Sequence, residues 1–522
     1  MRSVETVLAL VVVATVVATF ARHLSIPAPS LLVVVGVGVG LIPGVPSIRV
    51  TPDVVSLVVL PPLIYAAGEE LAWRDLRQVW RPVAALAVGL VLASAAVVAV
   101  LAGLVTPLPG AAAFVLGAIL ASTDPVAVTA LGRRLSLPPR VQALVQAESL
   151  FNDATSLVLF RVAVSIAVAG GSVAWGHTIV EFIRLSLGGA AVGAVVAVAV
   201  GLVRRRTEDP VLETVIALVT PYLAYVAAEA AGASGVTAVV VASVAVGNRT
   251  GRFTTGDIRL QLEAVYGTVV FLLESVVFAL IGLELPVVVR GLSGREHLWP
   301  LEALAVTGGL LVVRILWVFP LSAADHVLRR RPGRPSWQVP AVVSWAGARG
   351  VIPLAATLSI PLTADGGAPF PGRDLIQVLA TSVIVVTLAV QGFSLAPLVR
   401  RAGVTLDPSV TGRQELAARR RLARSALDHL EQLAELEVAP EVVIEQLRRS
   451  LLARLDHLDG EVDRAGPEGS LEASYRRLRR DLIGVERAEL AHLYDQGQIN
   501  ESTRRRLARA LDLEQAGLEN GS

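Results

Sequence analysis

The polar residues most able to do chemistry lie within one long apolar run of the chain, residues 140–169. This run contains Glu148, Ser149, Asn152 and Asp153, whose spacing puts them on adjoining stripes of one helix face. A hydrogen bond between helices explains a lone serine in such a place, but two carboxylates and an amide need another explanation. Ionisable groups inside apolar segments are costly and mark ion or proton sites. We therefore predict such a site on this face.

Two further apolar runs are interrupted by polar residues, glycine and proline. Ser122-Thr123-Asp124-Pro125 interrupts one, and Gly347-Ala348-Arg349-Gly350 followed by Pro353 interrupts the other. An interior proline removes one backbone hydrogen bond and obstructs another, so both helices are predicted to break. The ends of broken helices present unpaired backbone dipoles, which favours an ion site where the two breaks meet. The other charges predicted at the middle of apolar runs are Glu274 and Arg314.

The elements that must position these residues are membrane helices. The chain has 522 residues, of which 54% are hydrophobic and 17% charged, whereas soluble chains carry about 25% charged residues. Its apolar runs are long enough, at about 1.5 Å per residue, to cross about 30 Å of hydrocarbon. We predict an all-α polytopic membrane protein with about thirteen transmembrane helices. Their predicted ranges are 4–20, 28–43, 53–68, 82–105, 110–132, 140–169, 178–203, 210–231, 233–248, 263–284, 299–324, 338–361 and 374–399.

The interrupted helices are the fifth and the twelfth, and an odd offset between two repeats requires opposite topologies. The sequence therefore predicts inverted repeats whose two interrupted helices cross at the ion site. Arginine is concentrated in alternate short loops, which places those loops in the cytoplasm and the amino terminus outside. From residue 404 the apolar runs end and charge becomes dense. We predict a transmembrane domain over 1–403 and a cytoplasmic helical tail over 404–522, for which a regulatory role is an alternative to the simple packing of a small helical domain.

Several classes of function are disfavoured by composition. The chain has no cysteine, so it has neither disulfides nor thiolate metal sites. It contains no phosphate-binding loop, no histidine cluster and no nucleophile triad, so no cofactor is expected. A net charge of +2 gives no indication of a nucleic-acid partner, and the expected partner is the lipid bilayer. The lysine-free, Arg/Ala/Val/Gly-rich usage favours a bacterial plasma (inner) membrane.

At these residues a resemblance to a known family becomes visible. It is carried by Ser-Thr-Asp-Pro-Val-Ala-Val at 122–128, Glu-Ser-Leu-Phe-Asn-Asp-Ala-Thr-Ser at 148–156, Ser-Trp-Ala-Gly-Ala-Arg-Gly-Val at 344–351, Leu-Pro-Pro-Leu at 60–63 and Arg-Ile-Leu-Trp-Val-Phe-Pro at 314–320. These segments resemble those of NhaP-type monovalent cation/proton antiporters, bacterial relatives of the sodium/proton exchanger family. The resemblance covers roughly residues 4–400. It implies a secondary transporter rather than an enzyme, a homodimer in the family's manner, with a core domain that moves against a dimerisation domain.

The resemblance also implies residue roles. Asp153 is then the carboxylate that binds cation and proton in turn, with Asn152, Ser149 and the Thr123 carbonyl in or near the Na⁺ shell. Asp124 faces the amino termini of the half-helices. Glu148 and Arg349 form a structural ion pair in the core. Because Asn152 is neutral, one charge is exchanged, which implies electroneutral 1:1 exchange of Na⁺, or Li⁺, for H⁺ in pH and sodium homeostasis.

The sequence departs from the family pattern at one place. Many relatives carry an acid just after Leu-Pro-Pro, where this chain has Ala66, and Glu69 and Glu70 about a turn later are interpreted as solvated loop acids. The cation therefore stays open, and a K⁺/H⁺ antiporter on the same fold is the main alternative. A remote alternative, an intramembrane aspartyl protease using Asp124 and Asp153, would need a Gly-x-Gly-Asp segment and a Tyr-Asp pair within an apolar span, and neither occurs.

Overall fold

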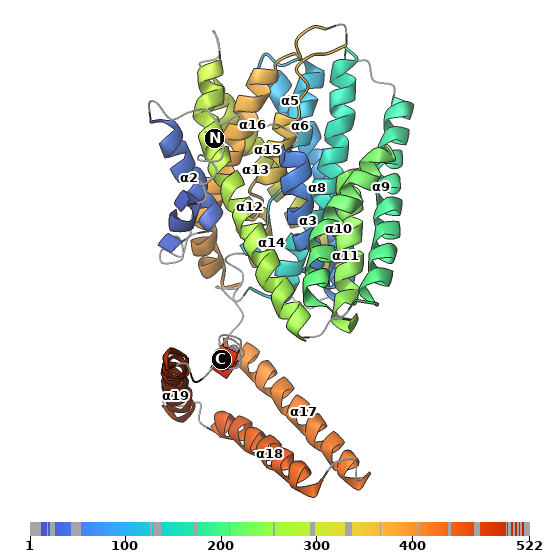
Figure 1. Ribbon diagram of the computed structural model, residues 1–522. Helices are drawn as coiled ribbons and strands as arrows, with labels where there is room; N and C mark the ends of the chain where they lie inside the picture. The colour runs from blue at the N-terminus through green and yellow to red at the C-terminus, as the bar shows by residue number, and fades with distance from the viewer. Residues whose placement is uncertain are drawn as a thin grey trace. The chain divides into compact units, whose positions relative to one another are not determined.

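The computed structural model divides the chain into two compact units, Met1–Leu406 and Asp407–Ser522 (Figure 1). The residues it describes are 12–17, 19–20, 27–42, 54–125, 128–129, 137–170, 175–207, 209–253, 256–292, 298–328, 337–365, 367–404, 408–436, 440–463, 470–496, 498, 503–504, 507–508, 511 and 514–515. Parts of four predicted spans lie outside the described residues, namely 4–11, 18, 43, 53, 126–127 and 130–132. Within the described ranges the regular elements are helices, apart from an isolated bridge between Thr363 and Pro369.

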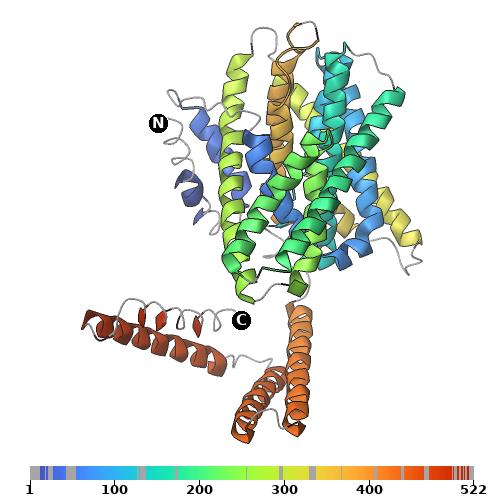
Figure 2. The same cartoon turned by 45° about the vertical axis from the view of Figure 1, so that its right-hand side comes forward.

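The first unit is a bundle of helices that lie side by side (Figures 1 and 2). In chain order the helices are α2 (Ala28–Gly40), η1 (Val54–Val59), α3 (Leu60–Glu69), α4 (Trp73–Ala84), η2 (Ala85–Leu90), α5 (Val91–Val105), α6 (Gly110–Leu120), α8 (Pro139–Val168), α9 (Trp175–Arg204), α10 (Pro210–Ala230), α11 (Gly235–Phe253), α12 (Gly256–Gly291), α13 (Trp299–Leu328), α14 (Gln338–Trp345), α15 (Val351–Leu358) and α16 (Arg373–Ala402).

Seven helical stretches in the described residues are long and apolar enough to cross a membrane. They are Trp73–Val105, Pro139–Val168, Thr178–Arg204, Pro210–Ala230, Ile258–Gly291, Trp299–Val327 and Arg373–Ala402. The first of them is longer than the predicted span over 82–105, because α4, η2 and α5 follow one another without a break. The predicted all-helical membrane architecture is therefore confirmed, whereas the count of thirteen stays a prediction.

Both predicted interruptions are present. Helix α6 ends at Leu120, and residues 122–125 are not helical. Residues 346–350 separate α14 from α15, and Pro353 lies in the first turn of α15, where a proline loses no intrahelical hydrogen bond. The proline- and glycine-containing segments thus interrupt both helices within their predicted transmembrane spans.

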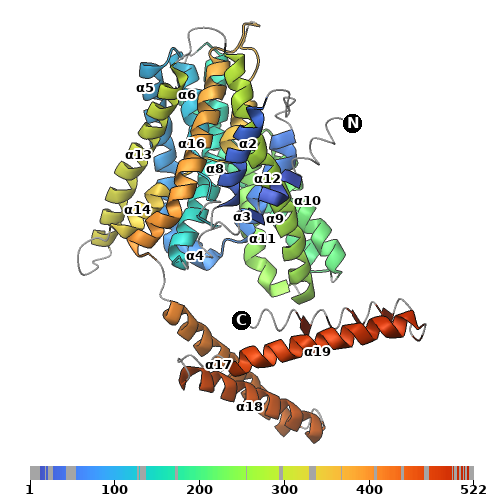
Figure 3. The same ribbon diagram turned by 90° about the vertical axis from the view of Figure 1, so that its left-hand side faces the viewer.

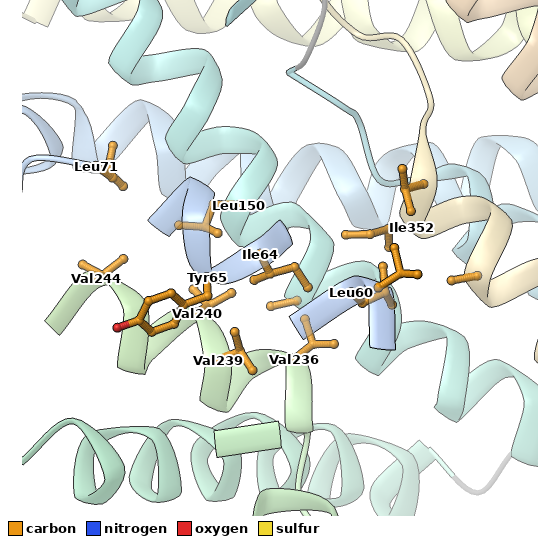
Figure 4. Close-up of a cluster of buried hydrophobic side chains, with 14 of the residues drawn as sticks. Leu60, Ile64, Tyr65, Leu71, Leu150, Val236, Val239, Val240, Val244 and Ile352 are labelled. Atoms are coloured by element: carbon orange, nitrogen blue, oxygen red, sulfur yellow. The ribbon is translucent and has the colours of Figure 1, made fainter. Parts of the chain in front are cut away.

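Close packing fixes the helices that surround the interruptions. A Cβ added to Gly282 of α12 would lie 2.2 Å from the Val33 carbonyl of α2, so glycine permits these two helices to touch. Helix α3 packs between α8 and α11, as the buried side chains in Figure 4 show. The residues labelled there are Leu60, Ile64, Tyr65, Leu71, Leu150, Val236, Val239, Val240, Val244 and Ile352. A second buried cluster joins α5, α6, α13 and α16, which lie together in Figure 3.

The second unit consists of α17 (Pro408–Glu435), α18 (Glu441–Asp463) and α19 (Ser470–Asp495). Helices α17 and α18 pack together, and Arg420 Nη2 donates to the Leu458 carbonyl at 2.8 Å. Most charged side chains of this unit are exposed, as expected for amphipathic helices.

Candidate functional site

The two interrupted segments meet, and backbone groups released by the breaks bind one another. The Asp124 amide donates to the Ala348 carbonyl at 2.7 Å, and Arg349 Nε donates to the Leu120 carbonyl at 3.0 Å. A Cβ on Gly350 would lie 1.6 Å from Asp124 Oδ2, so only glycine leaves room for this carboxyl. Since Gly350 precedes the first turn of α15, the structure places the Asp124 carboxyl at a helix amino terminus, where negative charge is favoured.

The polar face of α8 lies against the interrupted segment that follows α6. Ser122 Oγ donates to Asp153 Oδ1 at 2.8 Å. Asn152 Nδ2 donates to Thr123 Oγ1 at 2.7 Å, and the Thr123 amide donates to Asn152 Oδ1 at 3.4 Å. Ser149 Oγ donates to the Thr123 carbonyl at 2.5 Å. The residues that the sequence singled out on two separate helices are therefore brought together.

A cavity of about 360 Å³ lies beside these residues. On the side of the crossing it is lined by Ser122, Thr123, Asp124, Ser149, Asp153 and Gly350. Another part of the wall comes from Ala66 of α3, Glu70 directly after α3, and Glu274 of α12. Asp153 is buried, with 9% of its surface exposed, and its side chain reaches this space. Asn152 supports the segment around Thr123 but does not line the cavity.

The partner predicted for Glu148 is wrong. Its carboxylate forms a two-bond pair with Arg314 of α13, with Nη1–Oε1 at 2.6 Å and Nη2–Oε2 at 2.9 Å. Arg314 Nε also donates to the Val343 and Ser344 carbonyls at 3.2 and 3.1 Å. Arg314 therefore joins α8 to the carboxyl end of α14, where helix carbonyls lack intrahelical partners.

Arg349 binds main-chain carbonyls rather than Glu148, the partner predicted for it. It donates to the Leu120 and Gly347 carbonyls, and its own amide donates to Thr387 Oγ1 at 3.1 Å. The side chain thus satisfies carbonyls that the interruptions release. Helical spacing on α8 identified Glu148 as buried, but it could not identify which of two buried arginines would reach it.

Three acidic or replaced positions near the cavity also bear on the predictions. Ala66 lines the cavity with a methyl group, at the position where many relatives carry an acid. Glu70, interpreted as a loop acid, is exposed and lines the same space. Glu274 was recognised as a charge within an apolar run, but nothing in the sequence indicated that it would share a cavity with Asp153.

Interrupted helices that cross beside a buried carboxylate are characteristic of secondary transporters, a class in which half-helix ends surround an ion site within the membrane. The family described as "Sodium/hydrogen exchanger, transmembrane" matches residues 9–401. The chain therefore belongs to the sodium/hydrogen exchanger family. It is a multi-pass membrane protein of a family that exchanges cations for protons, and this family is not a class of enzymes, so the protease alternative is dropped. Its ions are cargo rather than cofactors.

Known relatives extend over much of the chain. An uncharacterized Na⁺/H⁺ exchanger of Mycobacterium tuberculosis is 34% identical over 525 residues, which cover 98% of this chain and 96% of the relative. A Na⁺/H⁺ antiporter of Aphanothece halophytica is 29% identical and covers 78% of this chain and 75% of its own length. The sodium proton antiporter of Methanocaldococcus jannaschii has the same fold, with a TM-score of 0.63 at 19% identity over 78% of this chain and 99% of that one.

Proposed function

We propose that this protein exchanges Na⁺, and also Li⁺, for H⁺ across the bacterial plasma membrane by alternating access, one cation for one proton. Its role would be pH and sodium homeostasis. The observation that carries the proposal is Asp153, a buried carboxylate that reaches the cavity and whose hydrogen bond comes from a neutral hydroxyl. The relatives named Na⁺/H⁺ exchanger and Na⁺/H⁺ antiporter support the choice of ions.

In this proposal Asp153 binds Na⁺ or H⁺, but not both at once. A carboxylate without a fixed cation beside it is costly within apolar surroundings, so it is stable when either ion neutralises it. Protons therefore compete with the cation, and the half-saturation concentration for the cation rises as the pH falls. The same group carries different cargo in the two directions, and exchange needs no covalent step.

The neighbouring residues supply oxygen atoms and hold them in place. Ser149 and the Thr123 carbonyl, already within hydrogen-bond distance of each other, are proposed ligands of Na⁺. Asn152 fixes the Thr123 side chain, and Asp124 balances the amino-terminal dipole of α15. Glu148 with Arg314, and Arg349 with the carbonyls it binds, hold the crossing together.

The transport model has an architecture that goes with it. Thirteen transmembrane helices in two inverted repeats would form a core domain, which contains the crossing, and a dimerisation domain, within residues 1–403. The core would move against the dimerisation domain of a homodimer. The amino terminus would lie outside, and residues 404–522 would form a cytoplasmic helical tail with a regulatory role. Arginine-rich alternate loops and the separate buried clusters around α5–α6 and α3–α11 support this arrangement.

Potassium is the alternative cation. A relative from Bacillus pumilus, named a sodium, potassium, lithium and rubidium/H⁺ antiporter, is 30% identical over 78% of this chain and 62% of its own length. Ala66 contributes no carboxylate to the cavity, and fewer charged ligands weaken the preference for a small, strongly hydrated ion. Both points favour a wider cation range.

The test is exchange in everted membrane vesicles between about pH 6 and 9, followed by a pH-sensitive dye after addition of Na⁺, Li⁺ or K⁺. We expect wild type to dissipate the proton gradient and Asp153→Asn to give no detectable exchange. Asp374→Asn is the matched control, because Asp374 is exposed in the first turn of α16 and does not line the cavity. A wild-type protein that responds to none of the three cations would contradict the proposal.

A further inference from the structure

A carboxylate outside the crossing faces the same cavity and has no part in the exchange described above. Glu274 lies in α12, a helix that contributes no residue to the two interruptions. It lines the cavity together with Asp124 and Asp153, and Val270, one turn earlier in α12, does so as well. One face of α12 therefore forms part of the cavity wall.

The surroundings of Glu274 leave its charge to be balanced from the cavity. Leu63, Ala66 and Ala67 of α3 line the space with apolar groups. No arginine or histidine occurs among the lining residues that the structure describes. The buried arginines of the described residues bind other groups: Arg314 binds Glu148, Arg349 binds main-chain carbonyls, and Arg204 binds Glu213. Within the described part of the chain no hydrogen bond or ion pair to Glu274 is formed.

A cavity lined by carboxylates and by no cationic side chain has a negative potential, which concentrates cations in it. Its low-dielectric walls strengthen that attraction relative to bulk water. Asp153 belongs to α8, beside the crossing, and Glu274 to α12, so a cation in the cavity can interact with one carboxylate from each helix. Glu274 is partly buried and Asp153 buried, and a negative charge shielded from water without a countercharge is costly, so both groups favour an occupied cavity.

We propose that Glu274 is a second cation-binding carboxylate, which draws the ion into the cavity from the α12 wall and holds it next to Asp153. This inference rests on the proposed function and adds a residue to its site. Glu274 sets how tightly the cation is bound before transport, while Asp153 carries it. Loss of the Glu274 charge therefore weakens cation binding without removing the exchanging group.

The experiment compares Glu274→Gln with wild type by two measurements on the full-length protein. One is ²²Na⁺ binding to purified protein in detergent, and the other is the dependence of exchange on Na⁺ concentration in everted vesicles. Removing one nearby charge is expected to raise both the dissociation constant and the half-saturation concentration about tenfold, with the maximal rate retained within about twofold. A side chain with only a structural role would lower the maximal rate and leave the half-saturation concentration unchanged.

Two further variants keep the test decisive. Glu263→Gln changes an exposed carboxylate on the same helix that does not line the cavity, so it is expected to bind like wild type. Glu274→Asp retains the charge on a side chain one methylene shorter, and it is expected to retain most of the binding even if the Gln variant does not purify as a folded protein. The inference is overturned if Glu274→Gln binds ²²Na⁺ as tightly as wild type. It is also overturned if Glu274→Asp binds ²²Na⁺ as weakly as Glu274→Gln.

Failure of the proposed function gives a different result. If wild type exchanges none of the cations, or Asp153→Asn still exchanges them, the transport role of Asp153 is wrong whatever the Glu274 variants do. The ²²Na⁺ measurement does not depend on exchange. A binding defect confined to Glu274→Gln would then still support the cation site on α12, and its absence would overturn it.

Discussion

Two carboxylates of α8, Glu148 and Asp153, differ in their ion-pair partners and in their access to the cavity. Glu148 is 1% exposed, lies away from the cavity and binds Arg314 through both of its oxygens. Asp153, little more than one turn later, is 9% exposed, reaches the cavity and accepts a hydrogen bond from the neutral Ser122 hydroxyl. Glu148 has an arginine of the protein as its countercharge, whereas the hydrogen bond to Asp153 comes from an uncharged side chain.

From this difference we infer a structural role for Glu148, while the proposed exchange gives Asp153 the role of ion carrier. A carboxylate paired with a buried guanidinium has its countercharge fixed within the protein, and removal of either partner leaves an uncompensated ion. In the proposed exchange, a carboxylate with only neutral donors takes its countercharge from the cavity. Sequence spacing makes Glu148 and Asp153 look equivalent, so the helices that approach each residue assign their roles.

The largest effect on stability is expected from Arg314→Met, which turns the paired carboxylate into an unpaired one. Breaking one side of a buried pair typically costs about 3–5 kcal/mol, and here the carbonyls of Val343 and Ser344 lose their donor as well. We expect a much lower apparent melting temperature in detergent and less protein in the membrane. Arg400→Met, at an exposed arginine near the end of α16, is expected to melt like wild type.

A double variant sharpens this result. Glu148→Gln/Arg314→Met leaves no buried charge at this place, so it is expected to recover most of the stability. It should also retain exchange, because Glu148 does not line the cavity. If the double variant is as unstable as Arg314→Met alone, the cost comes from lost packing or lost carbonyl contacts rather than from the stranded carboxylate.

The same two carboxylates indicate how much could be predicted from the sequence. Pro125, Pro353 and the glycines around Arg349 predicted both interruptions, since proline and glycine act on their own backbone. Helical periodicity also predicted that Ser149, Asn152 and Asp153 share a polar face. Periodicity describes one helix, however, and does not say which helix comes to lie against it.

That missing information explains the errors. Arg314 and Arg349 are both buried arginines later in the chain, and Arg314 reaches Glu148 of α8 from α13, which packs against α14. In the same way, the position of Glu274 in α12 has no local signal that relates it to Asp153. Contacts between residues far apart in sequence follow from the bundle as a whole, as in the α2–α12 contact at Gly282.

A moderate effect is expected from a pair of serine variants on α8. Ser149 Oγ donates to the Thr123 carbonyl at 2.5 Å, and Ser156 Oγ donates to the Ala118 carbonyl at 2.7 Å. Each change to alanine removes one buried hydrogen bond, which costs about 1 kcal/mol, so both variants should lose similar stability. Only Ser149 lines the cavity. We therefore expect Ser149→Ala alone to raise the half-saturation concentration for Na⁺, measured in everted vesicles.

Equal transport in the two serine variants would contradict a cation-shell role for Ser149 and reduce it to a hydrogen bond between helices. A raised half-saturation concentration in Ser156→Ala would show instead that the whole face of α8 acts on the site through its position. The stability of the two variants serves as the internal control, because Ser149→Ala and Ser156→Ala are expected to lose the same stability.

The smallest effect is expected where an ion pair lies in water. In α18, Arg448 Nη1 is 3.0 Å from Glu445 Oε2, at 37% and 45% side-chain exposure. Solvent screens this pair and both side chains are free to move, so Arg448→Gln should change the free energy of unfolding by less than about 0.5 kcal/mol. Thermal unfolding of the full-length protein at low and high salt provides the measurement. A loss comparable to that of Arg314→Met would show that geometry alone determines the strength of an ion pair, whereas a negligible loss supports burial as the property that makes the Glu148–Arg314 pair structural.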